Sequence, residues 1–224
     1  MAKRITKKNT KEILNILNDL YPDAKAELNF ENSFELLIAT ILSAQTTDVQ
    51  VNKVTSKLFK ELKTPEDYLK LNAEELAERI RTIGFYNNKS RNILATCRLL
   101  VEKHDSKVPE SRDELMSLPG VGRKTANVVI SNAFGTPAIA VDTHVFRVSN
   151  RIGIANSSTV EETEVDLMKK IDKTMWSKAH HLLIFHGRRM CKARRPICEE
   201  CPLTEYCKYY YENGSDKRWR KFIW

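Results

Sequence analysis

Four cysteines near the end of the chain constrain its fold most strongly, because they must converge within one short loop. Of five cysteines in 224 residues, four form the pattern C-x6-C-x2-C-x5-C: Cys191, Cys198, Cys201 and Cys207. The opening MAKRITKKNTKE lacks the apolar segment of a secretory signal, which disfavours disulfides. Zinc sites usually use paired short spacings, so the array favours a 4Fe-4S cluster, with zinc as the alternative.

A second constraint is the stretch LPGVGRKTANVVISNAFGTPAIAVD, which runs from residue 118 to residue 142. Gly120 and Gly122 flank Val121 in a turn that we expect to be too tight for most residues with a Cβ. A helix is predicted from Arg123 to Ala133, with Gly135 as its stop. Such a turn leaves backbone N–H groups bare at a helix N-terminus, where they can hold an anion such as a DNA phosphate.

Lys124 falls in the first turn of this predicted helix. The positive helix end and the adjacent Arg123 both disfavour the ammonium form, and a neutral lysine is a nucleophile that can form a Schiff base. Asp142 is the carboxylate that could accept protons and stabilise positive charge. The alternative is an exposed lysine without a chemical role. When this residue is considered alone, that alternative is favoured.

The segments LPGVGRKTANVV and VDTHVFRV resemble the helix-hairpin-helix and the Gly/Pro-Asp segment of the endonuclease III family of DNA glycosylases. The resemblance implies that residues 118–122 form a DNA-phosphate-binding hairpin, and we expect Gly120, Val121, Gly122 and Arg123 to contact DNA. It implies that Lys124 is the Schiff-base nucleophile and Asp142 the catalytic carboxylate. The cysteine array also reproduces the iron–sulfur spacing of the family, which implies a 4Fe-4S cluster in place of zinc.

Two further segments resemble DNA-facing loops of the same family. In LSAQTTDVQVNK, the resemblance implies that Gln45 enters the space that a flipped nucleotide leaves behind. In GFYNNKSRN, Phe85 takes a position where the family more often has leucine, and we expect it to be the apolar companion of Gln45. The sequence of the first loop alone favours an ordinary loop and helix cap.

Composition and periodicity predict an all-α fold. The chain is 42% apolar, contains only seven glycines and shows long helical patterns without clear alternating runs. Beyond the helix that follows the hairpin, helices are predicted over 10–21 behind a Thr10 cap, 34–42, 49–62, 73–83, 86–103, 145–152, 160–171 and 176–187. Cys97 lies on the apolar face of one of them and is expected to be a buried hydrophobe.

The chain carries a net charge of +8, which favours a polyanionic partner. Lys192, Arg194 and Arg195 lie between the first two cysteines, and a metal-bound loop would hold them rigidly for contact with phosphates. The alternative is a solvated charge run. The histidines at 180, 181 and 186 lack carboxylates at ligand spacing and are expected to be packing or capping residues. The terminal SDKRWRKFIW could stack on nucleic acid or dock on the core.

The resemblance covers nearly all of residues 10–208 and implies two helical lobes with a DNA cleft between them. We expect residues 26–135 to form one lobe, residues 1–25 with 136–210 to form the iron–sulfur lobe, and residues 211–224 to form a basic-aromatic tail. No apolar run reaches the roughly 18 residues of a membrane span, so we expect a cytoplasmic protein that is associated with the nucleoid through DNA binding. We also expect it to be a monomer.

The implied function is that of a bifunctional DNA glycosylase and AP lyase of base excision repair. It would remove oxidised pyrimidines from damaged double-stranded DNA and cut the strand 3′ to the abasic site by β-elimination. A pyrimidine-dimer glycosylase with the same lysine is the enzymatic alternative. A non-enzymatic helix-hairpin-helix DNA-binding module and an iron–sulfur electron carrier are two further hypotheses, and both predict no strand cutting.

Overall fold

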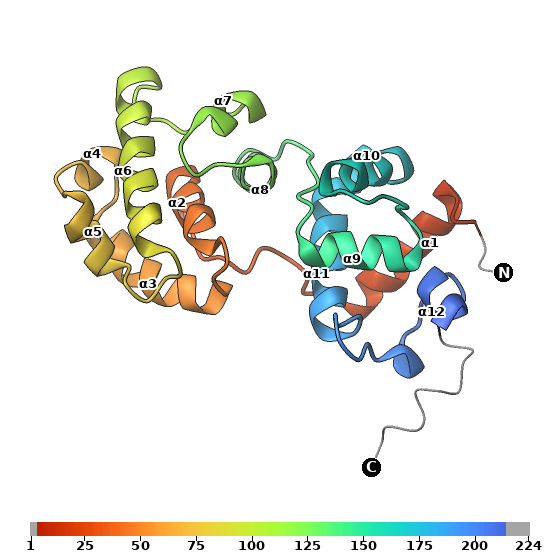
Figure 1. Ribbon diagram of the computed structural model, residues 1–224. Helices are drawn as coiled ribbons and strands as arrows, with labels where there is room; N and C mark the ends of the chain where they lie inside the picture. Colours follow the sequence, from red (N-terminus) through yellow and green to blue (C-terminus); the bar gives the residue numbers. More distant parts are fainter. Residues whose placement is uncertain (1–3, 214–224) are drawn as a thin grey trace, which may run out of the picture. The chain divides into compact units, whose positions relative to one another are not determined.

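The structure, a computed structural model, describes residues 4–213 of the chain. The regular elements of these residues are all helices, and no strand occurs among them (Figure 1). The prediction of an all-α fold is therefore confirmed. No helix in this range is both long and apolar enough to cross a membrane. The expected roles of Trp219, Phe222 and Trp224 in the tail fall outside the described residues.

The chain divides into two compact units, Ala26–Ala138 and a second unit made of Met1–Lys25 with Ile139–Trp224. The helices of the first unit are α2 (Ser33–Ser43), α3 (Asp48–Glu61), α4 (Pro65–Tyr68), α5 (Ala73–Arg79), α6 (Tyr86–Lys103), α7 (Arg112–Ser117) and α8 (Arg123–Ala133). Helix α2 lies at the centre of this unit and packs against α3, α6 and α8. Its apolar residues are almost fully buried, which makes it the core of the unit.

The second unit joins the first helix of the chain to the last third of the sequence. Its helices are α1 (Lys7–Leu20), α9 (Thr143–Ile152), α10 (Val160–Lys170), the 3-10 helix η1 (Lys173–Met175), α11 (Trp176–Arg189), the 3-10 helix η2 (Cys198–Glu200) and α12 (Lys208–Asn213). Helix α11 packs against both α1 and α9. Leu182, Leu183 and Phe185 of α11 are buried in the core of this unit, as predicted.

Helix starts follow side-chain caps, and one predicted cap is wrong. Helix α1 begins behind Thr6, whose side chain accepts a hydrogen bond from the N–H of Asn9. Thr10 lies inside the helix, fully buried, and its hydroxyl donates to the Thr6 carbonyl at 2.9 Å. The apolar pattern starts only at Ile13, which is why a threonine inside the helix resembled its cap.

The helix predicted over 73–83 is also too long. Helix α5 ends at Arg79, and the N–H of Ile80 closes the turn on the carbonyls before it. Ile80 and Ile83 are both buried, although they lie beyond the helix. The helical spacing of apolar residues therefore continues past the end of α5. Because these two residues are buried without being helical, the sequence pattern predicted a helix that is too long.

Candidate functional site

The turn before α8 is held against α6. The N–H of Val121 donates to the Leu118 carbonyl at 3.1 Å, and the hydroxyl of Thr96 on α6 donates to the Pro119 carbonyl at 2.9 Å. Gly120 has φ 79°, and a Cβ there would lie 3.0 Å from Asn92 Nδ2. Position 120 therefore requires glycine both for its backbone and for its close packing.

Gly122 differs from what the sequence predicted. Its φ is −90°, and a Cβ there would meet no atom within 4 Å, so the turn itself does not require glycine at this position. Gly122 is exposed and caps α8 without a side chain. Val121 is buried, with 6% of its surface exposed. The result is an N-terminus of α8 that a ligand can approach at the level of the backbone.

Lys124 lies in the first turn of α8, and its side chain is exposed. Arg123, beside it, is half-buried. Because α8 is fixed at its start by the hairpin and packs against α2 and α7, the Lys124 backbone is held by a rigid frame. An exposed amine on such a frame can reach an electrophile that lies at the helix end.

Asp142 is the N-cap of α9 in the other unit. Its Oδ1 accepts hydrogen bonds from the N–H groups of His144 and Val145, both at 2.8 Å. One carboxylate oxygen therefore fixes the side chain, and Oδ2 lies outside these two bonds. The apolar pattern predicted the start of this helix at Val145, without Asp142 as the cap, whereas α9 begins at Thr143.

Gln45 and Phe85 both adopt left-handed backbone conformations, with φ of 55° and 58°. Both are exposed, and Phe85 retains 62% of its surface. Their loops touch, since a Cβ on Gly84 would lie 3.4 Å from the Gln45 carbonyl oxygen. Non-glycine residues with positive φ are uncommon, so these two loops carry a constrained part of the surface.

The four cysteines of the C-terminal array are half-buried between the end of α11 and the start of α12. Burial raises the pKa of Cys201 to about 11, and burial also raises the pKa values of Cys198 and Cys207. The nearby cysteines reinforce these shifts, since like charges oppose one another. Bound iron would supply the opposing positive charge, so the donor set fits an iron–sulfur cluster.

Within residues 4–213, no three His, Cys, Asp or Glu side chains are grouped so that they could hold a single metal ion. A tetrahedral zinc site would draw its thiolates to about 2.3 Å from one ion. A 4Fe-4S cluster has four irons, each able to take its own cysteine, so its ligands need not meet at one point.

Two arginines of α9 hold the start of the cysteine loop, and no sequence pattern indicated them. Arg147 Nε donates to the Cys191 carbonyl at 3.2 Å, and its second nitrogen, Nη2, donates to the Gly187 carbonyl at 2.9 Å. Arg151 Nη1 donates to the Lys192 carbonyl at 2.8 Å and lies 3.6 Å from Cys191 Sγ. The helix that Asp142 caps therefore also carries the anchors of the loop.

His186 links the cysteine loop to the core of its unit. Its Nδ1 lies 3.1 Å from the Tyr21 hydroxyl, and its Nε2 lies 3.7 Å from Cys201 Sγ. Burial lowers the pKa of His186 to about 4. The expectation that this histidine serves packing fits its burial, and its ring nitrogens add hydrogen-bonding contacts that spacing did not predict.

The basic residues between the first two cysteines are all exposed, namely Lys192, Arg194 and Arg195. Arg195 has φ 53°, a left-handed conformation within the loop. The arginine clamps from α9 fix the backbone on the N-terminal side of these residues. Their positive charges are thus carried on a segment whose path is largely set by other contacts.

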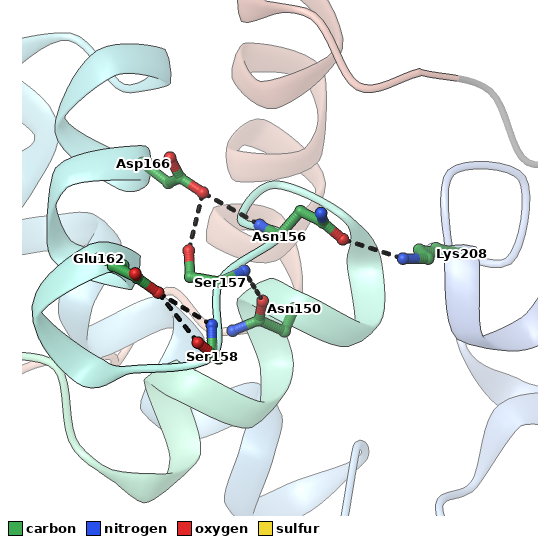
Figure 2. A pocket seen from close by; sticks show the side chains of 7 residues that line it. All are labelled: Asn150, Asn156, Ser157, Ser158, Glu162, Asp166 and Lys208. Atoms are coloured by element: carbon green, nitrogen blue, oxygen red, sulfur yellow. Dashed lines mark hydrogen bonds between the residues drawn. The ribbon is translucent and has the colours of Figure 1, made fainter.

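A polar hollow lies beside α10, close to the end of the cysteine loop (Figure 2). Asp166 Oδ2 accepts hydrogen bonds from the Asn156 N–H and the Ser157 hydroxyl at 3.1 and 2.8 Å. Lys208 Nζ donates to Asn156 Oδ1 at 3.0 Å. These bonds connect α12, which begins directly after Cys207, to the loop before α10. The hollow therefore belongs to the structural scaffold of this unit.

Two family models match the chain. The model of the HhH-GPD superfamily base excision DNA repair protein covers residues 38–173, and the model of the iron-sulfur binding domain of endonuclease III covers residues 191–207. The second match begins and ends at the first and last cysteines of the array. The first match includes the loop of Gln45, the hairpin, Lys124 and Asp142, and the second includes all four cysteines of the array.

Curated relatives and solved structures agree with these models. Endonuclease III of Bacillus subtilis is 52% identical over 89% of this chain and 93% of the relative, and that of Escherichia coli is 51% identical over 88% and 94%. A trapped endonuclease III–DNA covalent intermediate matches with TM-score 0.89 and 53% identity over 93% of this chain and 98% of that one. A non-covalent endonuclease III–DNA complex matches with TM-score 0.90 and 52% identity over 95% and 100%.

Proposed function

Since the chain belongs to the endonuclease III family and is a DNA glycosylase with AP lyase activity, we propose that Lys124 and Asp142 carry its chemistry. The observation that supports this most is the likeness to a protein trapped in a covalent intermediate with DNA. Such an intermediate needs a nucleophile, and Lys124 offers an exposed amine at the N-terminus of α8.

In the proposed reaction, the damaged nucleotide is flipped out and Lys124 Nζ attacks C1′ of its sugar. The bond from C1′ to the base breaks and the base leaves with a proton. The C1′–O4′ bond of the resulting aminal then opens, O4′ takes a proton, and the C=N bond of the Schiff base forms between C1′ and Lys124 Nζ. Removal of a C2′ proton then expels the 3′ phosphate, which cuts the strand by β-elimination. Asp142, held through Oδ1, stabilises the cationic sugar and assists proton transfer through its other oxygen.

The proposed partner is damaged double-stranded DNA, bound by one protein chain. The N-terminus of α8, which Gly122 leaves without a side-chain cap, would receive a backbone phosphate, because helix N–H groups and the helix dipole both attract anions. Glycine at position 122 would let that phosphate come close, which gives the exposed Gly122 a reason that its own packing does not supply.

The enzyme has a 4Fe-4S cluster, and we propose that Cys191, Cys198, Cys201 and Cys207 bind it. When bound, the cluster supplies a rigid covalent link between these four positions. Neither departure of the base nor β-elimination transfers an electron, so the reaction does not need a redox group. The proposed role of the cluster is to order the loop that carries Lys192, Arg194 and Arg195.

Replacing Arg194 and Arg195 together by alanine should weaken binding to damaged and undamaged duplex DNA alike. Each lost phosphate contact lowers the slope of log affinity against log salt by nearly one, so the slope should fall by up to about two. Titration of labelled duplexes at several salt concentrations measures this. The double variant Lys57→Ala with Lys60→Ala, exposed on α3, removes the same charge as a control. Unchanged affinity and slope would mean that the loop faces away from DNA.

Truncating Gln45 or Phe85 to alanine should impair action on base-paired lesions most. Unpairing and unstacking a nucleotide costs a few kcal/mol, and inserted side chains offset part of it. We expect about a 10- to 100-fold loss on a thymine glycol duplex, which corresponds to about 1.4–2.8 kcal/mol. The loss on an abasic site in single-stranded DNA should be much smaller. Equal losses on both substrates, in single-turnover assays, would remove the wedge role.

The lesion class is tested by borohydride trapping on four oligonucleotides. They carry thymine glycol, an abasic site, a pyrimidine dimer or no damage. Oxidised pyrimidines as substrates predict trapping with thymine glycol and with the abasic site. Trapping with the pyrimidine dimer in place of thymine glycol would favour the alternative glycosylase, and trapping with none would refute the Schiff-base mechanism.

A further inference from the structure

Lys89 is a buried lysine in the first turn of α6, with only 5% of its surface exposed. Its Nζ donates to the carbonyls of Leu42 and Ala44 at 2.8 and 2.6 Å and lies 3.3 Å from the Thr46 hydroxyl oxygen. All three partners belong to the end of α2 and the loop that follows it. The side chain therefore crosses from one helix to the loop of another.

This position is unfavourable for a cation unless those partners are present. Lys89 sits at the positive end of α6, and burial lowers its pKa. Its three partners compensate, because α2 ends at Ser43 and its last carbonyls have no partner within the helix. An ammonium group at the negative end of α2 caps these carbonyls from outside the helix.

The contacts of Lys89 bracket Gln45. Ala44 and Thr46, the residues on either side of Gln45, both lie within hydrogen-bonding distance of Lys89 Nζ. The backbone N–H of Lys89 donates to the Phe85 carbonyl at 3.0 Å, which is a regular helical bond at the start of α6. The side chain of Lys89 is therefore specific to the loop that carries Gln45, whose φ is 55°.

We propose that Lys89 is a positioning residue that holds Gln45 in its strained, exposed geometry before DNA arrives. The inference rests on the proposed wedge role of Gln45 and adds the group that prepares it. A left-handed conformation is disfavoured for glutamine, so a loop without the clamp would relax to more ordinary backbone angles. Bound DNA would then have to restore the left-handed backbone, and part of the binding free energy that drives insertion would be used for that ordering.

The test compares Lys89→Met, which keeps the length and loses the charge, with Lys89→Arg, which keeps the charge and the donors. Lys103→Met, exposed near the other end of α6, is the matched control. Single-turnover rates are measured on a thymine glycol duplex and on an abasic site in single-stranded DNA. We expect Lys89→Met to lower the ratio of the duplex rate to the single-strand rate by about 10- to 100-fold, since small misplacements of a side chain cost this much in rate. Lys89→Arg should recover part of the ratio and the control should keep it.

A double-mutant cycle with Gln45→Ala separates positioning from general stability. If Lys89 acts through the loop, Lys89→Met should cost little more once Gln45 has been truncated. Fully additive losses, or equal losses on both substrates, would overturn the inference. Should Lys89→Met fail to fold, as judged by its thermal midpoint, Thr46→Val removes one acceptor alone and should shift the ratio in the same direction by less. An unchanged ratio in that variant would also overturn it.

The same measurements distinguish the two levels of the proposal. A selective loss in Gln45→Ala, together with a wild-type ratio in a folded Lys89→Met, would leave the wedge in place and refute the role of Lys89 alone. Equal losses in Gln45→Ala on both substrates would refute the wedge, and the inference about Lys89 would fall with it.

Discussion

Lys124→Gln is expected to abolish the borohydride-trapped protein–DNA adduct and strand cleavage, while binding to damaged DNA persists. Glutamine has nearly the reach of lysine but no amine, so no bond to C1′ can form. Loss of a nucleophile costs on the order of 10⁴-fold or more in rate, which places the variant at the background of the assay. The phosphate contacts proposed for the start of α8 come from backbone N–H groups, which the substitution leaves in place.

Lys103→Gln provides the control for charge, because Lys103 is exposed on α6 and lies away from the hairpin in the sequence. Trapping is measured by the shift of labelled DNA on a denaturing gel, and binding is measured separately by titration without borohydride. Undiminished trapping in Lys124→Gln would show that another amine forms the Schiff base. Loss of binding together with trapping would show that the side chain holds DNA instead of reacting with it.

Local signals predicted the helices around the hairpin well. Helices α6 and α8 have the bounds that the sequence indicated, Tyr86–Lys103 and Arg123–Ala133. The glycines on either side of α8 explain part of this, since they end regular structure whatever the rest of the fold does. Cys97 also has the expected environment: it is fully buried, and burial raises its pKa to about 12.

Other features depend on partners distant in the sequence, and no local pattern indicated them. Lys89 contacts residues more than 40 positions earlier, and Arg147 reaches Cys191 across a similar separation. In the sequence, both resemble ordinary basic residues on a helix. The left-handed backbone of Gln45 and Phe85 is equally hidden, because neither residue type signals it. Such features arise from packing, which fixes geometry only after the elements have come together.

Asp142 has a structural role as a helix cap that the sequence did not predict, in addition to its proposed catalytic role. The resemblance to a glycosylase motif implies a catalytic role for its carboxylate, and the apolar pattern predicts the start of α9 only at Val145. The structure makes the same carboxylate the cap of α9. One oxygen held by two backbone N–H groups leaves the other with a defined direction, so capping and the proposed chemistry support each other.

The purified protein is expected to be yellow-brown and to contain about four irons and four sulfides per chain, as four cysteine ligands require. Cys201→Ala should lose most of both. Cys201 is the thiol of the array whose pKa burial raises to about 11, and its Sγ lies 3.7 Å from His186 Nε2 in the interior of the unit. With the loop unlinked, the carbonyls that Arg147 and Arg151 hold would lose their fixed positions. The thermal midpoint should fall by on the order of 10 °C, given the stabilisation that a structural metal site supplies.

Cys97→Ala is the control for the loss of a thiol, because Cys97 is buried in the other unit and should leave the iron content unchanged. Iron and acid-labile sulfide are measured chemically, and the visible absorbance of the cluster follows its loss during a thermal ramp. Stoichiometric zinc without sulfide in the unsubstituted protein would refute the cluster. Full iron and sulfide in Cys201→Ala would show that its thiolate is not a required ligand. Because the readout is metal content and stability, it tests the ligand set independently of the lysine chemistry in the other unit.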